Sequence, residues 1–276
     1  MVASSHYRAF NLSVHLMPPP ALSSFVVAGA HSFGVDKEVN DPPWLVHLAK
    51  THPWHTLLLV EASPLLAAQL ETLVRKRTPF HKQSRVIVSN AAICPKRLSG
   101  QVLPFYTVAA KLITGDDRLP GFVDQFGTFE RARVEKLLPG ILRHLEGLRL
   151  TSLRDHRPFS GINWTLESLN QTVRAHPVPC RTLGDEVRRH NLPPVSVTLI
   201  DIEGLDCEVV AEMDGCDLAP HFLQFEQTWC TKPAVKVATS SVRMRTCGSV
   251  TLGYGEEHHP HWSDIAFYRN TSGHPH

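Results

Sequence analysis

Short apolar runs, each followed by a polar residue or a glycine, recur along this chain of 276 residues. Within each run the residues are almost continuously apolar, as TLLLV at 56–60 shows. Strands of a parallel sheet have this pattern, because helices cover both of their faces. We therefore expect buried strands at 25–28, 55–63, 85–93, 195–201 and 221–227, and a closing strand at 263–270.

Helix signals lie between several of these runs. Asp41, followed by two prolines, indicates a helix start before WLVHLAK, and Ser63-Pro64 opens a second helix. The apolar residues of 205–213 follow helical spacing. Strands that alternate with helices predict βαβ units, and hence an α/β fold with a Rossmann-like, doubly wound, mostly parallel sheet.

The alternation stops between about 104 and 178, where helix-like pieces such as EKLLPGILRHLEGL mix with loop. We interpret this segment as a cap-like insertion that forms a substrate wall. Residues 1–24 contain a run of prolines and are expected to form an N-terminal arm. The rest, 25–276, is expected to be one domain.

Composition narrows the classes of partner. The net charge of +2 and the pI near 8.3 are too balanced to favour a nucleic-acid partner. No apolar run is long enough for a transmembrane segment, and the N-terminus shows no apolar signal sequence. These features predict a cytoplasmic protein.

The cysteines and asparagines favour different compartments. None of the six cysteines forms a CxxC motif, so we expect small buried hydrophobic residues in a reducing compartment. Yet four of the seven asparagines begin N-x-[ST] sequons, which leaves a secretory route open. These four are Asn11, Asn163, Asn170 and Asn270.

The residues that follow the predicted strands are the candidates for a ligand site, because ligands of such sheets bind outside the carboxyl ends of the strands. GAHSFG follows the first strand, and its glycines allow a close backbone approach. Glu61 ends the second strand, where a carboxylate suits the two hydroxyls of a ribose. Asn90 follows the third strand, and it is equally a good turn residue.

Asp201 and Glu203 end the fourth strand, two residues apart in SVTLIDIEG. In an extended chain such residues point the same way, so the two carboxylates would repel and one pKa would rise. The pair could receive a cation, a substrate hydroxyl or the positive part of a cofactor. Alternatively, Glu203 caps the helix that follows Gly204.

The ordered set of strand-end motifs resembles the FkbM family of S-adenosylmethionine-dependent methyltransferases, over roughly 25–270. VVAGAHSFG resembles its glycine turn, LLLVEASPLLAAQL its second strand and helix, and HFLQFE and SDIAFYRN its closing strands. The most specific stretch is VPCRTLGDEV followed by LIDIEGLDCEVV, because the family carries a V-P-x-x-T-L lead-in and a D-x-E-G-x-E-like block.

This resemblance implies a Rossmann-like enzyme that uses S-adenosyl-L-methionine to methylate a hydroxyl, often on a sugar or small metabolite. The acceptor partner would thus be a small molecule or glycan. The implied contacts are Gly29, Ala30, His31 and Gly34 at the methionine end, Glu61 at the ribose, Asn90 and Ala91 at the adenine, and Asp201 and Glu203 at the reacting centre, with Asp201 also touching the cofactor. Asp201 or Glu203 would be the base, with His31 in reserve.

The first turn departs from the family pattern. Val27 stands where the family usually has an acidic residue, and the turn is one residue longer. This departure supports one rival function, a degenerate member that binds a ligand or partner without catalysis. A nicotinamide-dependent oxidoreductase is a second, separate rival. The absence of G-x-G-x-x-G disfavours the second rival. EEHHPHW at 256–262 is interpreted as a solvated loop, and no metal site is predicted.

Overall fold

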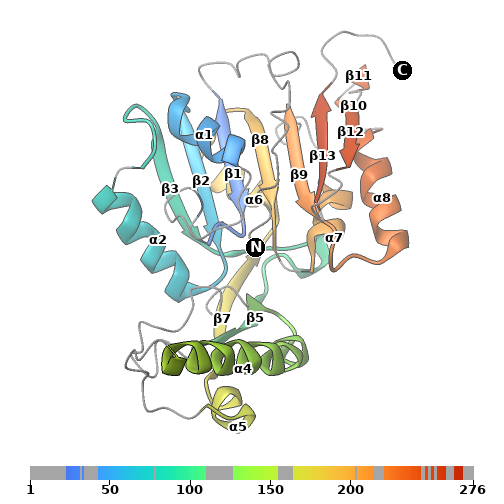
Figure 1. Cartoon of the computed structure of the whole chain (residues 1–276). Helices are drawn as coiled ribbons and strands as arrows, with labels where there is room; N and C mark the ends of the chain where they lie inside the picture. Colours follow the sequence, from blue (N-terminus) through green and yellow to red (C-terminus); the bar gives the residue numbers. More distant parts are fainter. Residues whose placement is uncertain are drawn as a thin grey trace.

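A seven-stranded sheet in the order β12-β13-β9-β8-β1-β2-β3 forms the centre of the molecule (Figure 1). The structure is a computed structural model. It describes residues 23–31, 33, 43–77, 79–109, 127–154, 164–202, 204–213, 221–243, 246–247, 250–251, 254–258 and 264–269. The predicted arm therefore lies almost entirely outside the described residues.

Five neighbouring strands of this sheet run parallel. They are β1 (Ser24–Ala28), β2 (Thr56–Glu61), β3 (Arg85–Asn90), β8 (Val195–Ile200) and β9 (Phe222–Glu226). β13 (Asp264–Arg269) pairs antiparallel with β9, and β12 (Tyr254–His258) pairs antiparallel with β13. The prediction of an α/β fold with a mostly parallel sheet is confirmed.

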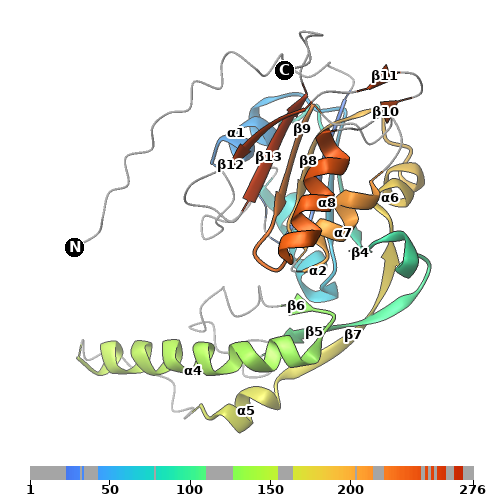
Figure 2. The same ribbon diagram turned by 90° about the vertical axis from the view of Figure 1, so that its right-hand side faces the viewer.

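Helices cover both faces of the sheet, because alternate residues of each strand point to opposite sides. Phe25 and Val27 of β1 belong to one apolar core, while Val26 and Ala28 belong to another. The first core includes α1 (Pro43–Thr51) and α2 (Pro64–Arg77). The second includes α6 (Leu183–Arg189), α7 (Asp206–Glu212) and α8 (Lys232–Arg243) (Figures 1 and 2). This two-sided cover explains the continuous apolar runs in the sequence.

Between β3 and β8 the chain forms a second layer. Its sheet has the order β4-β7-β5-β6, built from β4 (Ala92–Ile93), β5 (Val102–Val108), β6 (Gly127–Thr128) and β7 (Val173–Arg181). A 3₁₀ turn at Lys96–Leu98 follows β4, and α4 (Arg131–Arg154) and α5 (Leu166–Asn170) lie beyond the sheet (Figure 2). The apolar residues of α4 recur at helical spacing and pack on β5, β7 and α5. They are Val134, Leu138, Ile141 and Leu145.

Three C-terminal features were not predicted from the sequence, and helix α8 is the first of them. The acidic start of EEHHPHW, expected as a loop, belongs to strand β12, and residues 259–263 lie outside the described residues. A short antiparallel pair, β10 (Thr246–Cys247) with β11 (Val250–Thr251), precedes β12. Of the helices described here, none has both the length and the apolar character needed to cross a membrane.

A buried ion pair holds α6 against β3. Glu186 is fully buried; its Oε1 accepts a hydrogen bond from Arg181 at 2.6 Å and its Oε2 accepts one from the Ser89 hydroxyl at 2.8 Å. Burial alone would raise the pKa of Glu186, but the bonds from Arg181 and Ser89 outweigh it and the pKa is lowered. The carboxylate thus remains charged and ties the helix to the end of the third strand.

Four of the cysteines form disulfides, which corrects the interpretation of them as buried thiols. Cys94, just after β4, is bonded to Cys180 in β7, and Cys207 in α7 is bonded to Cys230 after β9. The sequence could not reveal these pairs, because their partners are 86 and 23 residues apart with no motif. Disulfides are rare in reducing compartments, so the cytoplasmic location stays a prediction without its original support.

We expect the double substitution of Cys94 and Cys180 by alanine to lower the free energy of unfolding by about 3 kcal/mol, because the bridge closes a long loop in the unfolded chain. Urea unfolding of the oxidised protein, with and without the substitution, measures this difference. Reduction is the control: it opens both bridges of the wild type and the remaining Cys207–Cys230 bridge of the variant, so the difference between the two proteins should then largely disappear. Equal midpoints for the variant and the oxidised wild type would show that the bridge does not form.

Candidate functional site

The strand order reverses between β1 and β8, which makes the carboxyl ends of these two strands the expected ligand position. The chain proceeds from β1 outward to β2 and β3, and then returns to place β8 on the other side of β1. The layer that contains α4 lies beyond this edge of the sheet (Figure 1). The site is therefore bounded by the main sheet on one side and by the second layer on the other.

Gly29 allows the two central strands to leave the sheet side by side. Its φ is +79°, and a Cβ at this position would collide with the backbone oxygen of Asp201. The N–H groups of Gly29 and Ala30 both donate to the Val60 carbonyl at 2.9 Å, and Asp201 N–H donates to Ala28. The glycine is thus required by the close approach of β1 and β8 as well as by the backbone conformation.

Glu61 fixes the turn after β1. Its Oε2 accepts a hydrogen bond from the backbone N–H of His31 at 2.8 Å, and its Oε1 accepts one from Ser63 at 2.7 Å. The side chain is only 5% exposed, and burial raises its pKa. His31 has a φ of +39°, which is unusual for a residue with a side chain, so this contact stabilises a strained turn.

Asn90 joins the ends of β2 and β3. Its Nδ2 donates to the backbone oxygens of Glu61 at 2.9 Å and Ala62 at 3.1 Å. The residue is exposed, whereas its neighbour Ala91 is buried and packs in the core. Of the two residues predicted to border the adenine, Asn90 therefore lies at the surface of the site and Ala91 lies beneath it.

Asp201 is exposed at the end of β8, beside the turn that contains Gly29. Glu203 and Gly34, the other residues predicted for this site, lie outside the described residues. The predicted repulsion between Asp201 and Glu203 therefore stays a prediction. Of the predicted residues that are described, the structure places Gly29, His31 and Asp201 around the reversal point.

Asp206 is a site residue that the sequence analysis missed. It lies at the start of α7 with 1% exposure, and its two oxygens accept hydrogen bonds from Ile202 N–H at 2.9 Å and Gly204 N–H at 3.0 Å. Burial raises its pKa to about 7, and the charge of Glu226 adds to the effect. The carboxyl holds the loop that carries Asp201. Its position two residues after Gly204, at a helix start, is a signal that could have identified it.

Arg133 brings the second layer to the same loop. It lies in the first turn of α4, and a Cβ on Gly204 would collide with its guanidinium group. The guanidinium lies 5.8 Å from the ring centre of Trp229, which follows β9 and is 42% exposed. Arg133 thus borders the loop after β8, and the exposed ring of Trp229 lies beside this arginine.

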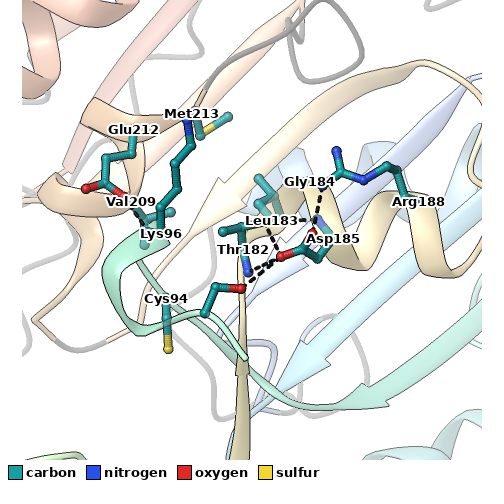
Figure 3. Close-up of a pocket in the computed structure, with 11 residues that line it drawn as sticks. Cys94, Lys96, Thr182, Leu183, Gly184, Asp185, Arg188, Val209, Glu212 and Met213 are labelled. Carbon is teal, nitrogen blue, oxygen red and sulfur yellow. Dashed lines mark hydrogen bonds and ion pairs between the residues drawn. The ribbon is translucent and has the colours of Figure 1, made fainter. Parts of the chain in front are cut away.

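A hollow of about 300 Å³ lies between α6 and α7 (Figure 3). None of the predicted ligand residues lines it. Its Asp185 already accepts hydrogen bonds from Thr182, Ser99 and Arg188, and these contacts lower the pKa of that carboxyl to about 2. We therefore place the candidate site at the strand ends and not in this hollow.

The raised pKa of Asp206 predicts that stability falls as pH rises from about 3.8 to about 7. In this window the folded protein keeps a proton that the unfolded chain releases, so higher pH favours unfolding. Asp206→Asn cannot ionise and should flatten the slope of unfolding free energy against pH. Glu61 contributes a slope of the same sign in both proteins, so the difference between them isolates Asp206.

Asp185→Asn is the matched control above about pH 5, because that carboxyl is then ionised in both the folded and the unfolded state and should leave the slope unchanged. Urea unfolding at several pH values measures all three proteins. A wild-type slope equal to that of Asp206→Asn would contradict the prediction.

No protein-family model matches the chain, and no curated protein matches its sequence. Among solved structures, the chain is similar to the crystal structure of Methyltransferase FkbM from Methylobacillus flagellatus KT. The match has 10% identity and a TM-score of 0.39, and it covers 89% of this chain and 43% of that chain. The chain thus spans less than half the length of that protein. At this TM-score the match concerns the course of the chain alone, and neither cofactor nor substrate.

Proposed function

We propose that the protein is an S-adenosyl-L-methionine-dependent methyltransferase that methylates a hydroxyl group of a sugar or small metabolite. The observation that carries this proposal is the exposed carboxylate of Asp201 at the reversal point of the sheet, beside the rigid turn at Gly29. The FkbM-like order of motifs favours this cofactor. A nicotinamide cofactor is disfavoured because the turn lacks the G-x-G-x-x-G pattern.

The groups at the strand ends fit the polar parts of this cofactor. Asp201 is an exposed acceptor for an ammonium or hydroxyl group, and Glu61 would accept from ribose hydroxyls through the 5% of its surface that solvent reaches. Asn90 uses Nδ2 within the protein, which leaves its Oδ1 to accept from an adenine amino group. When bound, the cofactor would supply an electrophilic methyl group.

The protein's own part would be alignment and proton removal. The turn at Gly29 is held by Val60, and the loop of Asp201 is held by Asp206, so the two sides of the site are fixed before a ligand arrives. Asp201 would take the proton of the acceptor hydroxyl as it attacks, with Glu203 or His31 as alternative bases.

Arg133 and Trp229 would form the acceptor side. The exposed ring of Trp229 offers a flat apolar face of the kind that packs against a sugar ring, and Arg133 offers hydrogen-bond donors. Because Arg133 belongs to α4, this arrangement agrees with the proposed role of the 104–178 segment as a substrate wall.

One observation favours a non-catalytic relative as the second candidate. Val27, which replaces the family's acidic residue, is 1% exposed in the core, so it offers the cofactor no contact. The loss of one charge-assisted hydrogen bond would weaken binding by roughly 1.5–3 kcal/mol. A protein without activity would then bind a ligand or partner at the same edge.

Calorimetric titration with S-adenosyl-L-methionine, and separately with NAD, tests the proposal. We expect micromolar binding of S-adenosyl-L-methionine and no binding of NAD.

With hydroxylated acceptors, Asp201→Asn should lower the release of S-adenosylhomocysteine roughly 100-fold or more, because a general base contributes about 10²–10⁴-fold. The rates are compared at saturating S-adenosyl-L-methionine, because Asp201 is also placed against the cofactor and its substitution should weaken cofactor binding. Glu208→Gln, on the exposed side of α7, is the control. No heat with either cofactor, in folded protein, would favour the non-catalytic candidate.

Trp229→Ala should raise the KM for a sugar acceptor about fivefold, because a stacking contact contributes about 1 kcal/mol. The affinity for S-adenosyl-L-methionine should stay the same, since Trp229 is placed on the acceptor side. Val237→Ala removes another exposed apolar side chain and should change neither value. An unchanged KM for Trp229→Ala would remove the ring from the acceptor site.

A further inference from the structure

We infer that the chain folds in an oxidising, glycosylating lumen, where it forms both disulfides and receives an N-linked glycan on Asn170. This inference is independent of the proposed function. It combines two observations from different parts of the molecule: the paired cysteines and an exposed sequon on the second layer.

Both disulfides join elements that are distant in the sequence. The Cα atoms of Cys94 and Cys180 are 5.7 Å apart, and those of Cys207 and Cys230 are 6.0 Å apart, both within the usual range for a bridge. The first bridge lies where β4 runs beside β7, and its Cys180 is the residue of β7 that pairs with Ala92 of β4. The second ties the start of α7 to the segment after β9. Two separate pairs indicate an oxidising compartment.

The burial of the cysteines indicates when the first bridge forms. Cys94 and Cys180 are each 1% exposed, so neither an oxidant nor a reductant reaches the first bridge in the folded protein, whereas Cys230 in the second bridge is partly exposed. The first bridge must therefore form while the chain folds. In each bridge, two thiols give two electrons and two protons to the disulfide of a thiol–disulfide oxidoreductase, which becomes a dithiol.

Asn170 is the sequon asparagine whose surroundings the structure describes; Asn11, Asn163 and Asn270 lie outside the described residues. It is exposed at the last position of α5, on the far side of α4 from the main sheet (Figures 1 and 2). A glycan at this position would extend into solvent, away from the candidate ligand site. Asparagines in turns are often fixed by their own hydrogen bonds. Asn90 is of that kind, whereas Asn170 ends a helix with its side chain in solvent.

Thr172, the third residue of the Asn170 sequon, indicates that the glycan is also attached before the protein has folded. Thr172 is 4% exposed, and its hydroxyl donates to the Leu169 carbonyl at 2.7 Å. The hydroxyl is accessible to a modifying enzyme only before this segment folds. The Nδ2 of Asn170 would then displace a lipid-linked diphosphate from the anomeric carbon of the sugar. The C–O bond breaks, a C–N bond forms, and Nδ2 loses one proton. Glycan attachment and disulfide formation thus belong to the same stage of folding in the same lumen.

Peptide mapping of the full chain isolated from its own cells tests the inference. The protein is alkylated without reduction, treated with peptide N-glycosidase and digested. We expect linked peptides that contain Cys94 with Cys180 and Cys207 with Cys230. We also expect aspartate at position 170, since the glycosidase converts glycosylated asparagine to aspartate. Unmodified Asn170 overturns the inference, as does alkylation of these four cysteines before reduction.

Variants assign the glycan to this residue. In a eukaryotic secretory host, Asn170→Gln and Thr172→Ala should each lose one glycan on a gel, while Thr172→Ser keeps the sequon and the hydroxyl and should keep the glycan. Loss of the glycan from Thr172→Ala shows that the glycosylating enzyme recognises this sequon. The result holds even if the variant folds poorly, because the glycan is attached before folding. Equal mobility of all four proteins, wild type included, would contradict glycosylation at Asn170.

Discussion

The pairing of β1 with β8 is the constraint on which the rest of the structure depends. These strands lie about 170 residues apart in the sequence and are neighbours at the centre of the sheet. Gly29 makes this possible, because any larger residue would collide with the backbone of Asp201 as the two strands leave the sheet. The strand order also reverses between β1 and β8, so the exposed carboxylate of Asp201 lies at the reversal point. The candidate site is therefore a consequence of how the sheet closes around its central strand.

Buried carboxyl groups hold the loops around that site. Glu61 and Asp206 each accept hydrogen bonds from two backbone N–H groups, and burial raises both pKa values. Each fixes one side of the reversal point. Burying a carboxyl group costs desolvation energy. Here the hydrogen bonds from the loop backbone offset part of that cost, and they hold each loop in one conformation. The strand ends are thus held firmly, whereas the side that we propose for the acceptor depends on Trp229 and on Arg133 from the second layer.

Much of the main sheet could be predicted from the sequence, because continuous apolar runs identify strands covered on both faces. Helix α8 was missed although its apolar residues follow a clear amphipathic pattern, and strand β12 was missed because its residues, YGEEH, are mostly polar. At the site, Glu61 and Asp201 were found as polar residues at strand ends. Arg133 was not found, because it acts on a loop and a ring that other elements contribute. Asp206 was overlooked although its position at a helix start, two residues after Gly204, is a local signal.

The sequence by itself determined the α/β class, the strands and the residues at their carboxyl ends, because these depend on local patterns of apolar side chains and glycines. Only the tertiary structure decided which distant residues meet. It paired Cys94 with Cys180 against the expectation of free thiols, and it brought α4 to the loop after β8. Such contacts arise from packing between segments many residues apart, and no local pattern in the chain encodes them.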